Sequence, residues 1–141
     1  MLTEAAARHP ELEHRLAQHM LPEPLPFASY SFDGVIAMAV IMHLSHEEIR
    51  EAFGEIVRVL KPHRLFAYSV NTERAGLDRR GYDDRGRYFT CLPAAEWQQL
   101  HTEAGFATLD LREQGDLGGR AGVNWVSFVA RRRAVSVRTR M

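Results

Sequence analysis

The sequence predicts an α/β fold in which two parallel strands are joined by a helix. Residues 32–44 and 65–70 are almost wholly apolar, and the first run is rich in valine and isoleucine. Such continuous runs are typical of parallel strands, which we expect to be covered on both faces. Between the two runs, apolar residues recur at helical spacing from Ile49 to Leu60. This order predicts one right-handed strand–helix–strand crossover.

The limits of the central helix are also encoded. Ser45 and Glu48 have the spacing of a capping box, in which each side chain accepts a hydrogen bond from the other residue's backbone amide. Leu44 and Ile49 flank the cap as a hydrophobic staple. Pro62 ends the helix, because proline has no amide hydrogen to continue it.

The chain before the crossover begins with an alanine-rich helix that Pro10 interrupts. Residues 15–21 fit either the end of a helix or a short strand. Three prolines between residues 22 and 26 then require an extended connection.

After the crossover, residues 72–90 form a polar stretch without a period, which predicts a loop of about twenty residues. A helix follows from Pro93 to about Gly105, where glycine suits the residue after a helix. Alternating patterns over residues 106–112 and 123–130 predict two final strands, paired antiparallel.

Composition points to one globular domain. The 141 residues include 18 basic and 18 acidic side chains, so no overall charge attracts nucleic acid or an anionic membrane. The single cysteine excludes an internal disulfide and fits a reducing compartment. No apolar run is long enough to span a bilayer and no signal core is present, so we expect a cytoplasmic protein. Residues 1–131 are expected to form the domain and residues 132–141 a flexible basic tail.

The stretch from Phe32 to Val70 resembles the class I S-adenosylmethionine-dependent methyltransferases of the small-molecule, type 11-like branch. In that family, Phe-Asp-x-Val opens the fourth strand, a short apolar run closed by His-Leu ends it, and a helix with Glu-Ile-x-Arg-Val-Leu-Lys-Pro leads to the fifth strand. Here His63-Arg64 stands where the family has Gly-Gly, and histidine tolerates positive φ better than most residues. The matching residues are Phe32, Asp33, Val35, His43, Leu44, Glu55, Ile56, Arg58, Val59, Leu60, Lys61 and Pro62.

The resemblance implies an incomplete Rossmann-like methyltransferase sheet. The family's strand order is 3-2-1-4-5-7-6, and this chain matches only strands 3 to 7, the last two as an antiparallel hairpin. The fourth strand would then have an exposed edge. Three outcomes are open: residues 2–21 fold over the gap, two chains pair through it, or the chain is an N-terminally truncated piece of a longer protein.

S-adenosylmethionine is the cofactor that the resemblance implies. The family's glycine-rich turn and ribose-binding acid have no counterpart here, and Gly115–Gly122 reads as a hairpin loop. The adenine-side position falls on His19, Met20 or Leu21, where the family often has aspartate. The backbone of Ala37, Met38 and Ala39 would line the methionine end of the cofactor.

His43 is the candidate catalytic residue, because imidazole can accept a proton from a substrate hydroxyl or amine. Its alternative role is to support the strand–helix turn. The remaining histidines and acids show no ligand spacing, so no metal is expected. Tyr82, Tyr88 and Phe89 either cover a small organic substrate or anchor their loop.

Two functions follow. The first is methyl transfer to a small-molecule acceptor, which depends mainly on proximity and orientation and needs no visible catalytic motif. The second is a non-catalytic, methyltransferase-like module that forms a homodimer or binds a protein partner through the exposed fourth-strand edge.

Overall fold

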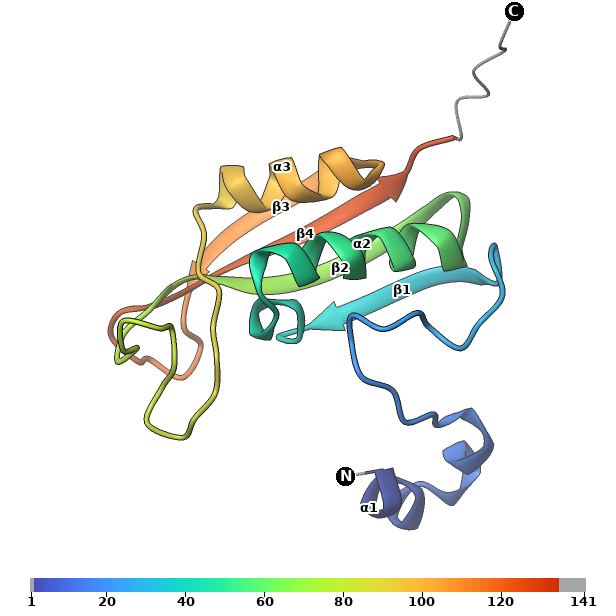
Figure 1. Cartoon of the computed structure of the whole chain (residues 1–141), viewed down its shortest axis with the longest axis horizontal. Helices are drawn as coiled ribbons and strands as arrows, with labels where there is room; N and C mark the ends of the chain where they lie inside the picture. Colours follow the sequence, from blue (N-terminus) through green and yellow to red (C-terminus); the bar gives the residue numbers. More distant parts are fainter. Residues whose placement is uncertain (1, 135–141) are drawn as a thin grey trace, which may run out of the picture.

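A four-stranded mixed sheet in the order β1-β2-β4-β3 organises the molecule (Figure 1). The computed structural model describes residues 2–134. Strand β1 pairs parallel with β2, whereas β4 pairs antiparallel with both β2 and β3. In chain order the elements are α1 (Leu2–Arg8), the 3-10 helix η1 (Pro10–Arg15), β1 (Phe32–Met38), the 3-10 helix η2 (Ile41–His43), α2 (His46–Val59), β2 (Leu60–Arg74), α3 (Ala94–Ala104), β3 (Phe106–Gly115) and β4 (Val123–Arg132).

The crossover β1-α2-β2 is confirmed. The Ser45 amide donates to Glu48 Oε1 at 2.9 Å, and the Glu48 amide donates to Ser45 Oγ at 3.3 Å, so the capping box is complete. His63 adopts φ 67°, which is the left-handed conformation expected where the family has glycine. The helix α3 ends at Gly105 with φ 118°, also as expected.

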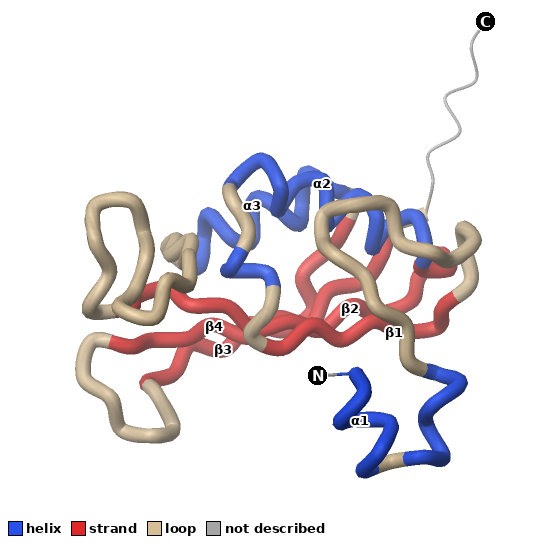
Figure 2. Tube along the Cα trace, turned by 60° about the horizontal axis from the view of Figure 1, so that its bottom comes forward, coloured by secondary structure: helices blue, strands red, loops and turns tan. Residues whose placement is uncertain are grey.

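The core lies between the sheet and the helices α2 and α3, which cover the same face (Figure 2). Its centre is aromatic: Phe66 and Tyr68 of β2 stack at 4.8 Å between ring centroids, and Phe53 of α2 packs edge-on against Phe66 at 5.8 Å. All three rings are fully buried. This burial, with the hydrophobic gain that accompanies it, fixes α2 on the sheet.

Two expectations about the strands are wrong. Strand β1 was expected to be covered on both faces, but Ile36 is 74% and Met38 51% exposed, because no described helix lies on the second face of the sheet. The strand considered for residues 15–21 does not form; η1 ends at Arg15 and no strand follows before β1. Residues 15–21 correspond to the family's third strand, which in the family order pairs only with the second strand. The described residues contain no counterpart of that second strand, so residues 15–21 have no partner for strand hydrogen bonds.

The N-terminal segment does not close the sheet. Helices α1 and η1 lie on the outer side of β1, and β1 remains the edge strand (Figures 1 and 2). The extended connection that follows is clamped by α2: Arg58 donates to the carbonyl oxygens of Leu25 at 3.0 Å and Phe27 at 2.8 Å, and Glu55 accepts from the Leu25 amide at 2.8 Å. These contacts give the matching Glu-Ile-x-Arg a structural role.

The C-terminal strand runs slightly past the expected end of the domain. Arg132 belongs to β4, is 5% exposed, and donates to the Leu60 carbonyl oxygen. The expected basic tail falls mostly on residues 135–141, which lie outside the described residues. Among the described residues, no helix has the length and apolar character needed to cross a membrane.

Candidate functional site

A cleft opens where β1 ends, on the face of the sheet that the helices leave bare. Its volume is about 330 Å³. Strands β1, β2, β3 and β4 and the hairpin loop between the last two all contribute to its wall. The lining residues are Met38, Ala39, Ser69, Gln114, Asp116, Leu117, Trp125 and Ser127. In open α/β sheets ligands bind outside the carboxyl ends of the parallel strands, which makes this cleft the candidate site.

The backbone at the mouth of the cleft is strained. Ala39 adopts φ 56°, a left-handed conformation that a non-glycine residue seldom takes. Its amide donates to both the carbonyl oxygen and the Oγ of Ser69, each at 3.1 Å. These two bonds hold the chain in a sharp turn at the end of β1, and strain of this kind occurs often at binding sites.

Among the residues that the structure describes, one charged side chain lines the cleft, and it is neutralised. Asp116 accepts from Arg120 Nη2 at 2.8 Å and from Arg120 Nε at 3.0 Å, and from Trp125 Nε1 at 3.3 Å. The Arg120 guanidinium and amide hold the pKa of Asp116 well below its usual range. The carboxylate therefore stays ionised, and its charge is balanced within the hairpin loop.

His43 belongs to η2, which follows β1 along the chain, and it does not line the cleft. Its Nδ1 is 2.8 Å from the carbonyl oxygen of Tyr88. A carbonyl can only accept, so Nδ1 carries the proton and Nε2 of the neutral ring is left as an acceptor. The ring also packs against Phe89 at 4.7 Å between centroids. The geometry thus gives His43 a defined tautomer, one that is able to accept a proton.

The long loop between β2 and α3, which contributes the Tyr88 carbonyl oxygen to His43, is ordered by two consecutive five-residue turns. Asp78 Oδ1 accepts from the Tyr82 amide at 3.0 Å, and Asp83 Oδ1 accepts from the Arg87 amide at 2.8 Å. Each turn follows the pattern Asp-x-x-Gly with glycine at positive φ, and Asp116 begins a third. Burial acts to raise the pKa of Asp83, but hydrogen bonds from Arg87 and Arg85 outweigh it and lower that pKa. This repeat is absent from the features predicted above, although the spacing of aspartate and glycine is visible in the sequence.

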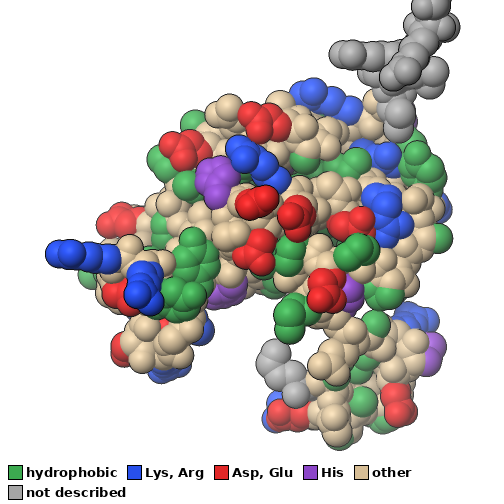
Figure 3. Space-filling model, viewed as in Figure 1, with side chains coloured by type: hydrophobic (Ala, Val, Ile, Leu, Met, Phe, Trp, Pro, Cys, Tyr) green, Lys and Arg blue, Asp and Glu red, His purple; other side chains and the backbone are tan. Residues whose placement is uncertain are grey.

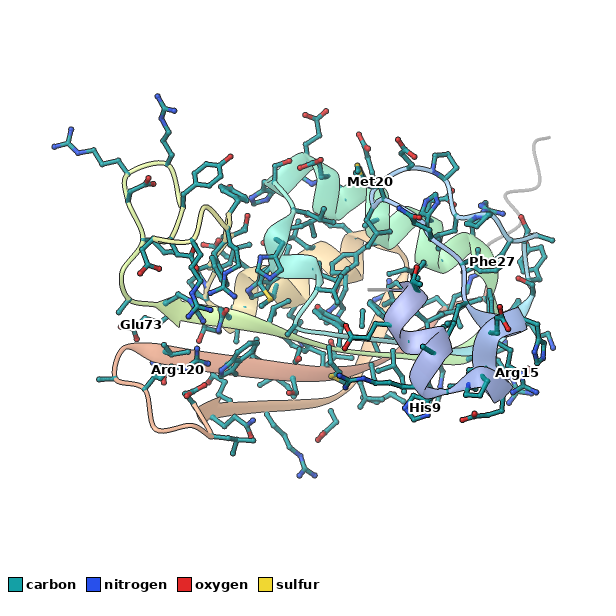
Figure 4. The ribbon with its side chains drawn as sticks, turned by 90° about the horizontal axis from the view of Figure 1, so that it is seen from below. His9, Arg15, Met20, Phe27, Glu73 and Arg120 are labelled. Carbon is teal, nitrogen blue, oxygen red and sulfur yellow. The ribbon has the colours of Figure 1, made fainter. Side chains whose placement is uncertain are left out.

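The predicted cofactor residues fall into two groups. Met38 and Ala39 line the cleft, and Ala37 packs against the core beneath them. His19, Met20 and Leu21 do not line it: Met20 lies beside α2, away from the hairpin loop marked by Arg120 (Figure 4). His19 instead contacts the carbonyl oxygen of Glu23 at 2.8 Å.

The described residues fit S-adenosylmethionine only in part. The strained turn at Ala39 offers a backbone wall at the end of β1. Among the described residues, Asp116 is the one acidic side chain that lines the cleft, and Arg120 already pairs with it. Met20 is 72% exposed, and its thioether accepts hydrogen bonds poorly. Residues 2–134 also hold no group of three or more histidine, cysteine or acidic side chains arranged around a common metal position.

Residues 1–68 match the family model described as a methyltransferase domain. The resemblance to the methyltransferase family is confirmed. No curated protein matches the chain in sequence. The solved structures that it resembles include SAM-dependent methyltransferases, so the family match and the fold agree.

One similar structure is the 1,6-didemethyltoxoflavin-N1-methyltransferase of Burkholderia thailandensis, with a TM-score of 0.73, 21% identity, and coverage of 93% of this chain and 57% of that one. Another is a SAM-dependent methyltransferase from Methanosarcina mazei, with a TM-score of 0.67, 18% identity, and coverage of 94% of this chain and 76% of that one. The [4+2]-cyclase SpnF gives a TM-score of 0.66 and 22% identity, and the match covers 93% of this chain and 62% of SpnF.

These similarities show the fold. The methyltransferase-like chain spans 57% and 62% of the lengths of the Burkholderia thailandensis enzyme and SpnF. Since one of these neighbours is named as a cyclase, the fold does not by itself determine the reaction.

Proposed function

We propose that this chain works in S-adenosylmethionine-dependent methyl transfer to a small molecule, with the cleft at the end of β1 as the place where cofactor and acceptor meet. The observation that carries the proposal is the cleft itself, built at the carboxyl end of the strand that the family match includes. The Burkholderia thailandensis structure holds S-adenosylhomocysteine and a small-molecule acceptor, which supports the same ligand classes here.

The chain's own contribution is to bind and orient the acceptor. Such positioning accounts for a large part of the rate in methyl transfer between two bound molecules. When bound, the cofactor supplies an electrophilic methyl group. The backbone of Ala37, Met38 and Ala39 would form one wall of its site.

His43 is the proposed proton acceptor. Its Nε2 is free to accept, because Tyr88 fixes the proton on Nδ1. His43 does not line the cleft, so this role requires an acceptor molecule that extends past Ala39. Replacing His43 by glutamine would then lower the methylation rate about 10²-fold or more.

The test is a calorimetric titration of the purified chain with S-adenosylhomocysteine. The proposal predicts saturable binding with a Kd in the micromolar range. The absence of any heat of binding at millimolar S-adenosylhomocysteine would refute the proposed methyl transfer for this chain. The second candidate function, the non-catalytic module described below, would then remain.

Two matched variants locate the binding. Met38→Asp places a charge in the cleft, whereas Leu109→Asp places the same charge on β3 outside it; the two side chains are similarly exposed, at 51% and 47%. We expect only Met38→Asp to abolish binding. Equal effects of the two changes would contradict the assignment of the cleft.

The second candidate function is a non-catalytic module that self-associates through β1. The Ala39 amide points to β2, so alternation along the strand turns the amides of Gly34, Ile36 and Met38 outward. An antiparallel pair of β1 strands centred on Ile36 would place Met38 opposite Gly34, so a large side chain would lie over a residue without one. Next to this edge, a hollow of about 620 Å³ that Ile36 and Leu65 help to line adds apolar surface.

This second function has its own test, the mass in solution by sedimentation. Ile36→Pro removes one outward amide while leaving the β1–β2 hydrogen bonds in place, since proline is tolerated on edge strands. We expect the wild type and Ile36→Val to be dimers of the 16.1 kDa chain, and Ile36→Pro to be a monomer. A monomeric wild type would rule out self-pairing.

A further inference from the structure

The left-handed conformation of Ala39 is not explained by its own side chain. Its φ is 56°, where the Cβ of an L-residue crowds the following carbonyl oxygen. Asparagine and aspartate offset this cost, because their short polar side chains form local hydrogen bonds. Alanine has only a methyl group, so groups outside residue 39 must hold the backbone in this conformation.

Ser69 on the neighbouring strand β2 supplies those groups. The Ala39 amide donates to the Ser69 carbonyl oxygen and to Ser69 Oγ, each at 3.1 Å. Any residue at position 69 would offer the carbonyl, whereas the second bond requires a hydroxyl. A left-handed alanine costs at least as much as one net hydrogen bond contributes, so both bonds are needed to offset it.

The conformation of Ala39 directs both parts of the candidate site. Ala39 and Ser69 line the cleft together. The next residue, Val40, is the N-cap of η2, and its carbonyl oxygen accepts from the His43 amide at 3.2 Å. The direction in which the chain leaves β1 at Ala39 therefore sets the cleft wall and the start of the turn that carries His43.

We infer that Ser69 is a positioning residue, whose hydroxyl holds Ala39 left-handed and so shapes the backbone wall that the cofactor contacts. Its effect on ligand binding rests on the proposed function, whereas its hold on Ala39 does not. Among residues 2–134, the Ser69 hydroxyl makes no other hydrogen bond. Its removal therefore tests this contact alone.

The first measurement requires no ligand. The carbon chemical shifts of Ala39 report its backbone conformation, and they are compared in the wild type, Ser69→Ala and Ser69→Thr. We expect Ser69→Ala to move these shifts away from left-handed values and Ser69→Thr, which keeps a hydroxyl, to preserve them. Unchanged Ala39 shifts in Ser69→Ala would overturn the inference.

A second pair of variants guards against misfolding of Ser69→Ala. Ser69→Val and Ser69→Thr have the same shape, and both residues suit a strand. They differ in the hydroxyl. Left-handed shifts of Ala39 in both variants would contradict the role of the hydroxyl, and we expect them only in Ser69→Thr.

The second measurement is the affinity for S-adenosylhomocysteine, determined by calorimetry. Ser69→Ala should weaken binding about tenfold in the wild-type background, which corresponds to the loss of one hydrogen bond. In the Ala39→Gly background the same change should weaken binding less than about twofold, because glycine adopts positive φ without steric cost. A hydroxyl that contacted the ligand directly would give equal losses in both backgrounds, and that result would overturn the inference.

Ser127→Ala is the matched control for this rescue. Ser127 lies directly opposite Ser69 on β4 and also lines the cleft, but its hydroxyl forms no hydrogen bond with Ala39. Whatever affinity Ser127→Ala loses, Ala39→Gly should leave that loss unchanged. Rescue of both serine variants by Ala39→Gly would show that glycine acts without regard to Ser69, and would contradict the inference.

The proposed function and the role of Ser69 can fail separately. If the wild type does not bind S-adenosylhomocysteine but the Ala39 shifts follow the Ser69 hydroxyl, the proposed function is rejected and the hold on Ala39 stands. If the wild type binds and Ser69→Ala causes equal losses in both backgrounds, the proposed function stands and the positioning role is rejected.

Discussion

Acidification should destabilise this protein through His101, which lies fully buried between α3 and the sheet. The Tyr68 hydroxyl lies 2.6 Å from His101 Nδ1, and Thr108 Oγ1 lies 2.7 Å from Nε2. Burial lowers the pKa of His101 from 6.5 to about 4, because the charged imidazolium loses its hydration in the core. The folded protein therefore keeps the ring neutral at a pH where the unfolded chain takes up a proton.

The sign and size of the effect follow from the two pKa values. Because the folded pKa is depressed, the stabilisation is complete above about pH 6.5 and is lost as the pH falls towards 4. Between pH 7.5 and 5.0, a pKa difference of 6.5 against about 4 corresponds to a loss of about 2 kcal/mol in the free energy of unfolding.

Urea unfolding, followed by tryptophan fluorescence at these two pH values, measures the loss. Carboxylates also titrate in this range, so the informative quantity is the difference between the wild type and His101→Gln, which cannot take up the proton. His14→Gln, at an exposed position in η1, is the control and should behave as the wild type does. If the wild type and His101→Gln lose equal stability on acidification, His101 is not held neutral and the argument from burial is wrong.

Three further predictions concern stability and are measured by the same urea unfolding. Arg58→Lys should cost ~1–2 kcal/mol, because a single ammonium cannot replace the several hydrogen bonds of the guanidinium; no loss would mean that the clamp on the extended connection is dispensable. Gly122→Ala should destabilise more than Gly115→Ala. Gly122 adopts φ 69°, and a Cβ added to it would lie 2.8 Å from the Ala75 Cβ, whereas a Cβ added to Gly115 would meet nothing within 4 Å. The reverse order would contradict the geometry of the hairpin loop. Ser45→Ala should cost about 1 kcal/mol as the cap of α2 is lost, and an unchanged midpoint would show that the cap is not needed.

The parts of the fold that depend on local patterns were predictable from the sequence. The capping box of Ser45 and the positive φ of His63 and Gly105 each follow from residue type and near neighbours. The antiparallel hairpin β3–β4 follows from alternation in two adjacent segments. The open face of β1 was not predictable in this way, because an apolar run shows that a strand can be buried but not whether another element covers it.

The site shows the same division. From the family resemblance, the backbone of Ala37, Met38 and Ala39 is expected to line the methionine end of the cofactor; in the structure, Met38 and Ala39 lie on the wall of the cleft at the end of β1. The contact between His43 and Tyr88 joins residues 45 positions apart, and the pairing of Asp116 with Trp125 depends on how the hairpin loop folds back. Neither contact leaves a periodic pattern in the sequence. The basic side chains that project from the long loop in Figure 3 were likewise recognised only as a polar stretch.

The most direct test of a ligand site at the end of β1 is to map S-adenosylhomocysteine binding on the amide resonances of the chain. We predict that the shifted resonances cluster at Ala37, Met38 and Ala39, with neighbouring shifts at Ser69 across the β1–β2 pair. Shifts confined to α1 and η1, or no shifts at millimolar ligand, would contradict the claim that the end of β1 is a ligand site.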